Sequence, residues 1–170
     1  MAIIPILKYG EPLLLEKSLP VEKVDEEIRR LIDDMVETMY ASEGIGLAAP
    51  QVGELKRIIM VDISSGEKPE ELVVLINPEI EAEEGSVITE EGCLSFPDLT
   101  LEIERPRYVR VRGLSPEGKE LDFEAEGLLA CALSHEIDHL NGVLIINRAS
   151  PLKRDLMVRK IRKKIREGEW

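Results

Sequence analysis

Residues 127–145 read GLLACALSHEIDHLNGVLI and contain both histidines of the chain. A helix can run through this stretch, with Gly127 directly before it and Gly142 able to end it. Apolar residues cover most of the circumference of this helix, and they are Leu128, Leu129, Ala130, Cys131, Ala132, Leu133, Ile137 and Leu140. The sequence therefore predicts a helix over residues 128–141 that is buried nearly all round.

Three of the polar side chains in this helix can act together. His135 and His139 are four residues apart, so they lie on one face and can share one metal ion. Glu136 lies beside the pair and can act as a general base on a water molecule. Unpaired polar groups are costly in an apolar interior, so the pattern indicates a functional site. A catalytic metal site usually has three protein ligands and one open position, and a third ligand is therefore needed.

Several ligands can be considered for the third position. The metzincin pattern requires a histidine where this chain has Ile145, so that class is excluded. A thermolysin-like site needs a downstream glutamate, and the only glutamates after Glu136 are Glu167 and Glu169, in the last four residues, which is a poor placement. Cys131 lies about 9 Å along the helix axis from an ion shared by the two histidines, too far for a Zn–S bond of about 2.3 Å.

The other cysteine, Cys93, lies in the stretch TEEGCLSFPD (89–98). Gly92 before it and Pro97 after it mark a loop or the end of a strand. A lone cysteine is more often a core residue, but here an incomplete site with two histidines needs a ligand. We therefore expect Cys93 to be the third ligand.

A second unusual stretch is EGIGLAAPQVG (43–53). Gly44 and Gly46 permit left-handed backbone or the close approach of another chain. Gln51 has a side-chain amide that can donate to a carbonyl oxygen. The stretch can be read as a helix stop and turn, with Gly44 as the left-handed residue, or as a cleft wall with one oxyanion donor.

The remaining elements indicate an α+β fold. The stretch 24–44 carries an amphipathic stripe, with Asp25 able to cap the start of a helix. Ser150-Pro151 begins a terminal helix with Leu152, Leu156, Ile161 and Ile165 facing inward. Between the helices, β-branched runs at 57–63, 71–80 and 85–92 read as strands, and 108–114 with 119–127 reads as a hairpin. We expect one domain over residues 1–170, with antiparallel strands in meanders around the buried helix.

Composition restricts the class of protein. The chain has 170 residues and a net charge of −12, which argues against a specific DNA-binding protein. No apolar run approaches the roughly 18 residues of a membrane span, and the N-terminus lacks the features of a signal peptide. We therefore expect a cytoplasmic protein with reduced cysteines. Residues 150–170 differ from the rest, because they carry eight Lys or Arg against three acidic residues.

Three separated stretches resemble the three motifs of the peptide deformylase family: GIGLAAPQ (44–51), EGCLS (91–95) and HEIDH (135–139). The likeness extends over essentially the whole chain. The absence of a long insertion between the first two motifs, together with the helical tail, resembles the Gram-negative-type subclass. The resemblance implies removal of the formyl group from N-formylmethionine at the start of nascent polypeptides.

The resemblance also implies roles for particular residues. Cys93, His135 and His139 would bind one divalent ion, which is Fe(II) natively in the family, while Zn, Ni or Co can replace it. Glu136 would be the general base and acid, and the amide of Gln51 and the backbone N–H of Leu94 would stabilise the oxyanion. Ile45, Gly46 and Leu128 would bind the substrate, and Glu91 with Arg105 would support the cysteine loop. The basic cluster at 153–166, in the C-terminal helix, would dock on the ribosome.

Two other functions use the same residues. A small zinc endopeptidase would need a downstream carboxylate ligand in place of Cys93. A closed structural metal site would need a fourth ligand, such as Cys131 or an acidic residue.

Overall fold

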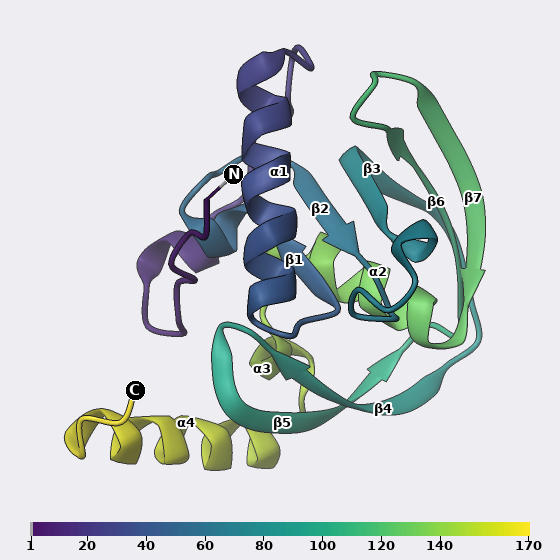
Figure 1. Ribbon diagram of the computed structural model, residues 1–170. Helices are drawn as coiled ribbons and strands as arrows, with labels where there is room; N and C mark the ends of the chain where they lie inside the picture. Colours follow the sequence, from purple (N-terminus) through teal and green to yellow (C-terminus); the bar gives the residue numbers. More distant parts are fainter. Residues whose placement is uncertain (1) are drawn as a thin grey trace.

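The computed structural model describes residues 2–170. Within this range, five antiparallel strands form the main sheet in the order β1 (Gly46–Ala48), β2 (Ile58–Val61), β3 (Val73–Glu84), β6 (Tyr108–Leu114) and β7 (Glu120–Glu126). The strands β4 (Val87–Cys93) and β5 (Phe96–Arg105) pair only with each other, as a ribbon that connects β3 to β6. Figure 1 shows this ribbon below the main sheet. The α+β class and the antiparallel pairing are as predicted.

The helices are α1 (Glu26–Ala41), α2 (Gly127–Leu140), the short α3 (Ile145–Arg148) and α4 (Pro151–Arg166). Three 3-10 turns, at Pro12–Leu15, Ala49–Val52 and Pro69–Glu71, lie in the connections. The side chains of Asp25 and Ser150 accept hydrogen bonds from backbone N–H groups in the first turns of α1 and α4, so both predicted caps are confirmed. None of the helices in residues 2–170 is long and apolar enough to cross a membrane.

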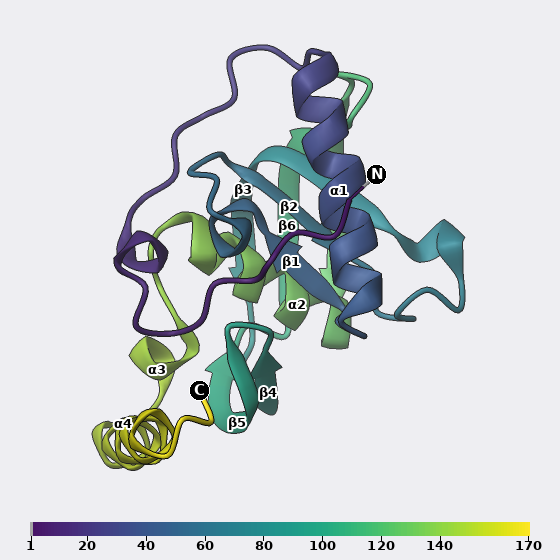
Figure 2. The ribbon, with the colours of Figure 1, turned by 60° about the vertical axis from the view of Figure 1, so that its left-hand side comes forward.

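The main sheet lies between two helices (Figure 2). Ile58 and Met60 of β2 pack in one core cluster with the buried face of α1, whereas Ile59 and Val61 pack in another with α2. Successive residues of a strand point to opposite faces, so β2 is apolar throughout and completely buried. The helix α2 is thus held against a rigid sheet, and its histidines point to the side where the ribbon β4–β5 lies.

A third core cluster joins the ribbon to the C-terminal helices. Phe96, Leu101 and Ile103 of β5 pack against Ile145 and Ile146 of α3 and against Met157 and Ile161 of α4. The strand β5 was not predicted, because Pro97 and a left-handed Asp98 (φ 62°) interrupt its pattern. The apolar residues of β5 therefore anchor the cysteine-bearing ribbon to the body of the protein.

Two predictions about α1 and α2 were wrong in detail, and a third is confirmed. Glu43 (φ 56°), not Gly44, is the left-handed residue after α1, and the N–H of Gly44 closes the cap on the carbonyl of Met39. The first turn of α2 is not buried, because it emerges beside a cleft, and Leu128 is 56% exposed. The expected stop of α2 is confirmed, since Gly142 is left-handed (φ 72°), and a Cβ atom there would overlap with the backbone of Leu15.

The buried face of α4 is narrower than predicted. Met157 and Ile161 are buried, and Ile161 was expected to be. Leu152 and Leu156 are exposed instead, because they lie about 140° around the helix from Met157 and Ile161, respectively. Ile165 is exposed in the last turn. Leu152 and Leu156 therefore form a short exposed apolar patch in the first half of α4.

Candidate active site

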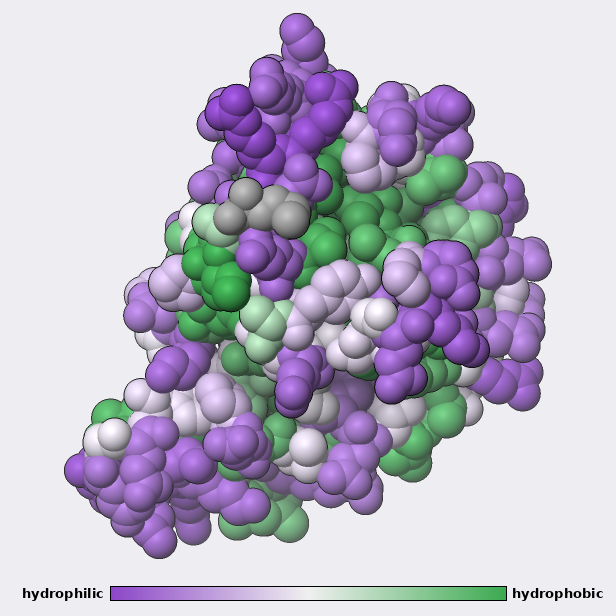
Figure 3. All heavy atoms as spheres, viewed as in Figure 1, coloured by the Kyte–Doolittle hydropathy of each residue, from purple (hydrophilic) through white to green (hydrophobic). Residues whose placement is uncertain are grey.

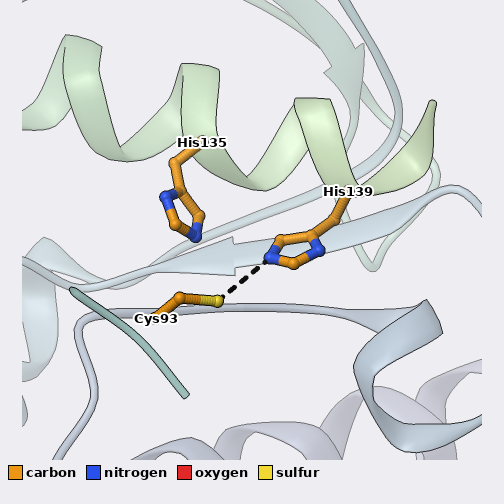
Figure 4. A group of neighbouring side chains, drawn as sticks. All are labelled: Cys93, His135 and His139. Atoms are coloured by element: carbon orange, nitrogen blue, oxygen red, sulfur yellow. Dashed lines mark hydrogen bonds between the residues drawn. The ribbon is translucent and has the colours of Figure 1, made fainter. Parts of the chain in front are cut away.

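Cys93, His135 and His139 lie together at the junction of the ribbon and α2 (Figure 4). Cys93 ends β4, and the two histidines lie one turn apart on α2. One ligand atom from each residue lies within 4.8 Å of the others, and Sγ of Cys93 is 3.4 Å from Nε2 of His139. Both cysteines of the chain are free thiols. The structure thus brings together the three residues that were expected to bind a metal.

The orientation of the histidines suits metal binding. Nδ1 of His135 lies 2.9 Å from Oε1 of Glu91, which leaves Nε2 for the centre of the site. Burial lowers the pKa of His139 well below its usual value, so this ring is neutral and can offer a lone pair. A histidine whose second nitrogen donates to a carboxylate is the usual arrangement in metal sites.

Glu136 lies beside the three ligands and is 5% exposed. Its Oε1 is buried without a hydrogen-bond partner, and burial raises the pKa of this carboxyl to about 7. Gly46 of β1 faces it so closely that a Cβ atom there would overlap with Oε2 of Glu136. A buried carboxyl group without a partner is costly unless a cation or a reacting molecule satisfies it. The unsatisfied Oε1 and the Cys-His-His donor set together fit a single divalent cation.

A chain of charged residues supports the site. Arg105 donates two hydrogen bonds to Glu91, at 2.8 and 2.9 Å, and one to Asp138 at 2.6 Å. Arg148 donates two more to Asp138 from the end of α3. The side chain of Arg105 is only 3% exposed and that of Glu91 11%, so the Glu91–Arg105 pair is a buried ion pair. The donors to Glu91, from His135 and Arg105, outweigh the effect of burial and lower its pKa to about 2.

The roles of Asp138 and Arg148 were not predicted from the sequence. Asp138 is a charged residue within a helix that is otherwise buried, and this was a signal that it has a partner. Arg148 carries no such signal, because its contact with Asp138 arises only when α3 folds back past the end of α2.

Gln51 lies on the other side of the cysteine. Its Oε1 accepts a hydrogen bond from the N–H of Ala48, and its Nε2 donates to Oγ of Ser95 at 3.1 Å and lies 3.6 Å from Sγ of Cys93. The side chain is therefore fixed with its amide hydrogens toward the candidate metal centre. Leu94 follows Cys93 directly, and Ser95, which was not predicted, helps to orient the amide.

The site opens into a cleft of about 610 Å³. Ile45, Gly46 and Leu128, the residues expected to bind substrate, all line it, as do Cys93, His135 and Glu136. Cys131 lines it too, but among residues 2–170 only Cys93, His135 and His139 form a group with metal-ligand spacing. Neither Cys131 nor Glu167 or Glu169 joins that group, so the ligand sets required by a closed structural site and by the endopeptidase are not found.

Known proteins share this sequence and architecture. The family model of polypeptide deformylase matches residues 3–155. A peptide deformylase of Thermodesulfovibrio yellowstonii is 52% identical over 164 residues, which is 96% of this chain and 99% of that one. The crystal structure of a peptide deformylase from Legionella pneumophila matches with a TM-score of 0.91 at 42% identity, over 98% of each chain.

A peptide deformylase from Ehrlichia chaffeensis, solved in complex with actinonin, matches with a TM-score of 0.88 at 40% identity, over 96% of this chain and 98% of that one. Since the family model and these relatives span nearly the full length, the chain is an enzyme of the polypeptide deformylase family.

Proposed function

We propose that this enzyme removes the formyl group from N-formylmethionyl polypeptides by metal-assisted hydrolysis and releases formate. The observation that carries the proposal is the buried, unpartnered carboxylate of Glu136 beside Cys93, His135 and His139, at the base of a cleft. A bound divalent cation would act as a Lewis acid and generate a nucleophile from water near neutral pH. Side chains and backbone groups of the protein transfer the proton and stabilise the oxyanion.

Glu136 is placed to move the proton. Its carboxylate accepts a proton from the attacking water and then delivers it to the departing amine. The pKa of about 7 allows the same group to do both near neutral pH. The Nε2 amide of Gln51 and the N–H of Leu94 donate hydrogen bonds to the developing oxyanion, where loss of one donor typically costs about 3 kcal/mol.

The ligand set favours particular metals. One thiolate with two imidazoles suits Fe(II), Zn, Co or Ni, and the thiolate reduces the Lewis acidity of the ion relative to a third imidazole. We propose Fe(II) as the native ion in this chain, with Zn, Ni or Co as replacements. Elemental analysis of protein purified anaerobically from its host would identify it, and a content of Zn alone with full activity would contradict the proposal.

The reaction is tested by formate release from a short N-formylmethionyl peptide, with Fe- or Ni-loaded protein. Glu136→Gln keeps the size of the side chain but cannot accept the proton, so we expect the rate to fall by about 10² to 10⁴. Glu117→Gln, in the turn between β6 and β7, is the matched control. Release that persists in Glu136→Gln would contradict the assigned base, and no release from the wild type would contradict the function.

The exposed surface of α4 supports a second part of the proposal, which is docking on the ribosome from the cytoplasm. Hydrophilic side chains cover most of the face of α4 that Figure 3 shows (lower left), and residues 150–170 carry a net charge of +5 on an acidic body. Such a helix can bind phosphate groups in a salt-dependent manner. The exposed Leu152 and Leu156 add apolar surface beside these charges.

Charge reversal tests the docking without removing the helix, which is required because Met157 and Ile161 belong to the core. Co-sedimentation with ribosomes at low salt should weaken in the variant Arg159→Glu, Lys160→Glu, Lys163→Glu. The same change at the exposed Lys8, Lys17 and Lys23 is the control. Equal binding by both triple variants would contradict a specific role for α4.

A further inference from the structure

The cleft wall at residues 44–46 is held mainly through its backbone, since two of its three residues are glycines. The carbonyl of Ile45 accepts a hydrogen bond from the N–H of Asp62 at 2.8 Å, and the carbonyl of Gly44 accepts one from Oγ of Ser65 at 3.1 Å. Both donors belong to the turn 62–66, which follows β2. The wall is therefore braced from behind by a turn that does not line the cleft.

The opposite side of the wall contacts the active site. The side chain of Leu94 fills the space that a Cβ at Gly44 would need, and the carboxylate of Glu136 fills the space beside Gly46. Because these two contacts are closely packed, neither Gly44 nor Gly46 can move toward the active site without displacing its neighbour. A displacement of the wall would therefore change the width of the cleft where an extended peptide must lie.

The turn 62–66 is organised around the fully buried carboxylate of Asp62. This carboxylate accepts hydrogen bonds from the N–H and the Oγ of Ser64, from the N–H of Gly66 and from the hydroxyl of Tyr40, at 2.6 to 3.1 Å. Tyr40 lies in the last turn of α1, just before the wall. Asp62 thus connects the end of α1, the turn and, through its own N–H, the wall.

Ser65 adopts a conformation that its residue type disfavours. Its φ is 50°, in the left-handed region where glycine is the usual residue. In this conformation its hydroxyl reaches the carbonyl of Gly44. Glycine at position 65 would relieve the backbone strain but would lose this contact.

We propose that Asp62 and Ser65 are positioning residues that set the backbone of residues 44–46 for binding of the peptide substrate. The inference rests on the proposed deformylase function. Neither residue touches the ligands or Glu136, and both act on the wall through hydrogen bonds. Binding of the peptide, and hence KM, should therefore respond more than kcat.

Two substitutions at Ser65 separate positioning from stability. Ser65→Ala and Ser65→Gly both remove the hydroxyl, but only glycine relieves the left-handed strain. We expect both to raise KM about fivefold, the size expected from loss of one neutral hydrogen bond, with kcat within about twofold. Ser65→Gly should be at least as stable as the wild type, whereas Ser65→Ala should be less stable. Ser115→Ala, which removes a similar turn hydroxyl between β6 and β7, should leave KM unchanged.

Hydrogen–deuterium exchange of the amides of residues 44–46 tests the brace without turnover. Exchange should be faster in both Ser65 variants and in Asp62→Asn than in the wild type and Ser115→Ala. Unchanged KM and unchanged exchange in Ser65→Gly would overturn the inference. A wild type that releases no formate would contradict the proposed function, whereas faster exchange at 44–46 in the variants would still support the brace.

Discussion

The Nδ1 of His135 lies 2.9 Å from the Oε1 of Glu91, inside a buried part of the active site. Because the pKa of Glu91 is lowered to about 2, its carboxyl carries no proton at neutral pH, and the hydrogen must belong to Nδ1. This contact selects the tautomer of His135 that presents Nε2 to the metal position.

Glu91→Gln should therefore weaken metal binding. A neutral amide holds the imidazole less firmly and makes Nε2 less basic, so the metal affinity should fall by about 10- to 100-fold. Competition with a chelator measures the affinity, and Glu90→Gln, at the exposed neighbouring position, is the control. Equal affinities in the two variants would contradict this role of Glu91.

The activity should depend on the ionisation of Glu136. Burial raises the pKa of this carboxyl to about 7, and the base must be ionised to accept a proton, so kcat/KM should fall as the pH falls. A cation in the adjacent site favours the carboxylate, which places the acid limb at or below pH 7. A profile of kcat/KM from pH 5 to 9 measures the midpoint of this acid limb. A midpoint clearly above pH 7 would contradict the assignment of Glu136 as the base.

Gly46 should tolerate no side chain, because a Cβ there would overlap with Oε2 of Glu136. In Gly46→Ala either the carboxylate or β1 must move, and we expect kcat to fall by about 10-fold or more. Gly92→Ala is the matched control in the same cleft, since its nearest neighbour would be the carbonyl oxygen of Leu99 at 3.7 Å. Equal kcat values in the two variants would contradict the steric argument.

The two arginines that bind Asp138 should differ in their effect on stability. Arg105→Met leaves Glu91 and Asp138 without their buried partner and should cost about 3–5 kcal/mol of unfolding free energy. The side chain of Arg148 is 49% exposed, so Arg148→Met should cost no more than about 1 kcal/mol. Urea unfolding of the metal-free proteins measures both values, and equal costs would show that burial does not set the energy of this network.

The features that follow from local sequence were predictable. Asp25 and Ser150 cap their helices through contacts with the next few residues, and an apolar stripe is visible in α1 without knowledge of its partner. Cys93 was predicted for a chemical reason, because two histidines in an apolar helix require a third ligand. Such inferences need only residue type and spacing.

The features that depend on distant contacts were not predictable in the same way. Glu43 takes the left-handed position, whereas Gly44 leaves room for the side chain of Leu94, about fifty residues away. Ser95 and Arg148 enter the site only when the ribbon and α3 fold against α2. In α4 the sequence offers two possible apolar faces, and only packing against β5 decides between them.

The choice of face in α4 leads to the last prediction. Met157 and Ile161 pack in the third cluster, so Met157→Ala and Ile161→Ala should each cost about 2–4 kcal/mol of unfolding free energy. Leu152 and Leu156 are exposed, so Leu152→Gln and Leu156→Gln should each change the unfolding free energy by less than about 0.5 kcal/mol. Urea unfolding at neutral pH compares the four variants. A large cost at Leu156 together with a small cost at Met157 would mean that the helix packs through the face expected from sequence, which contains Leu156 and Ile161 but not Met157.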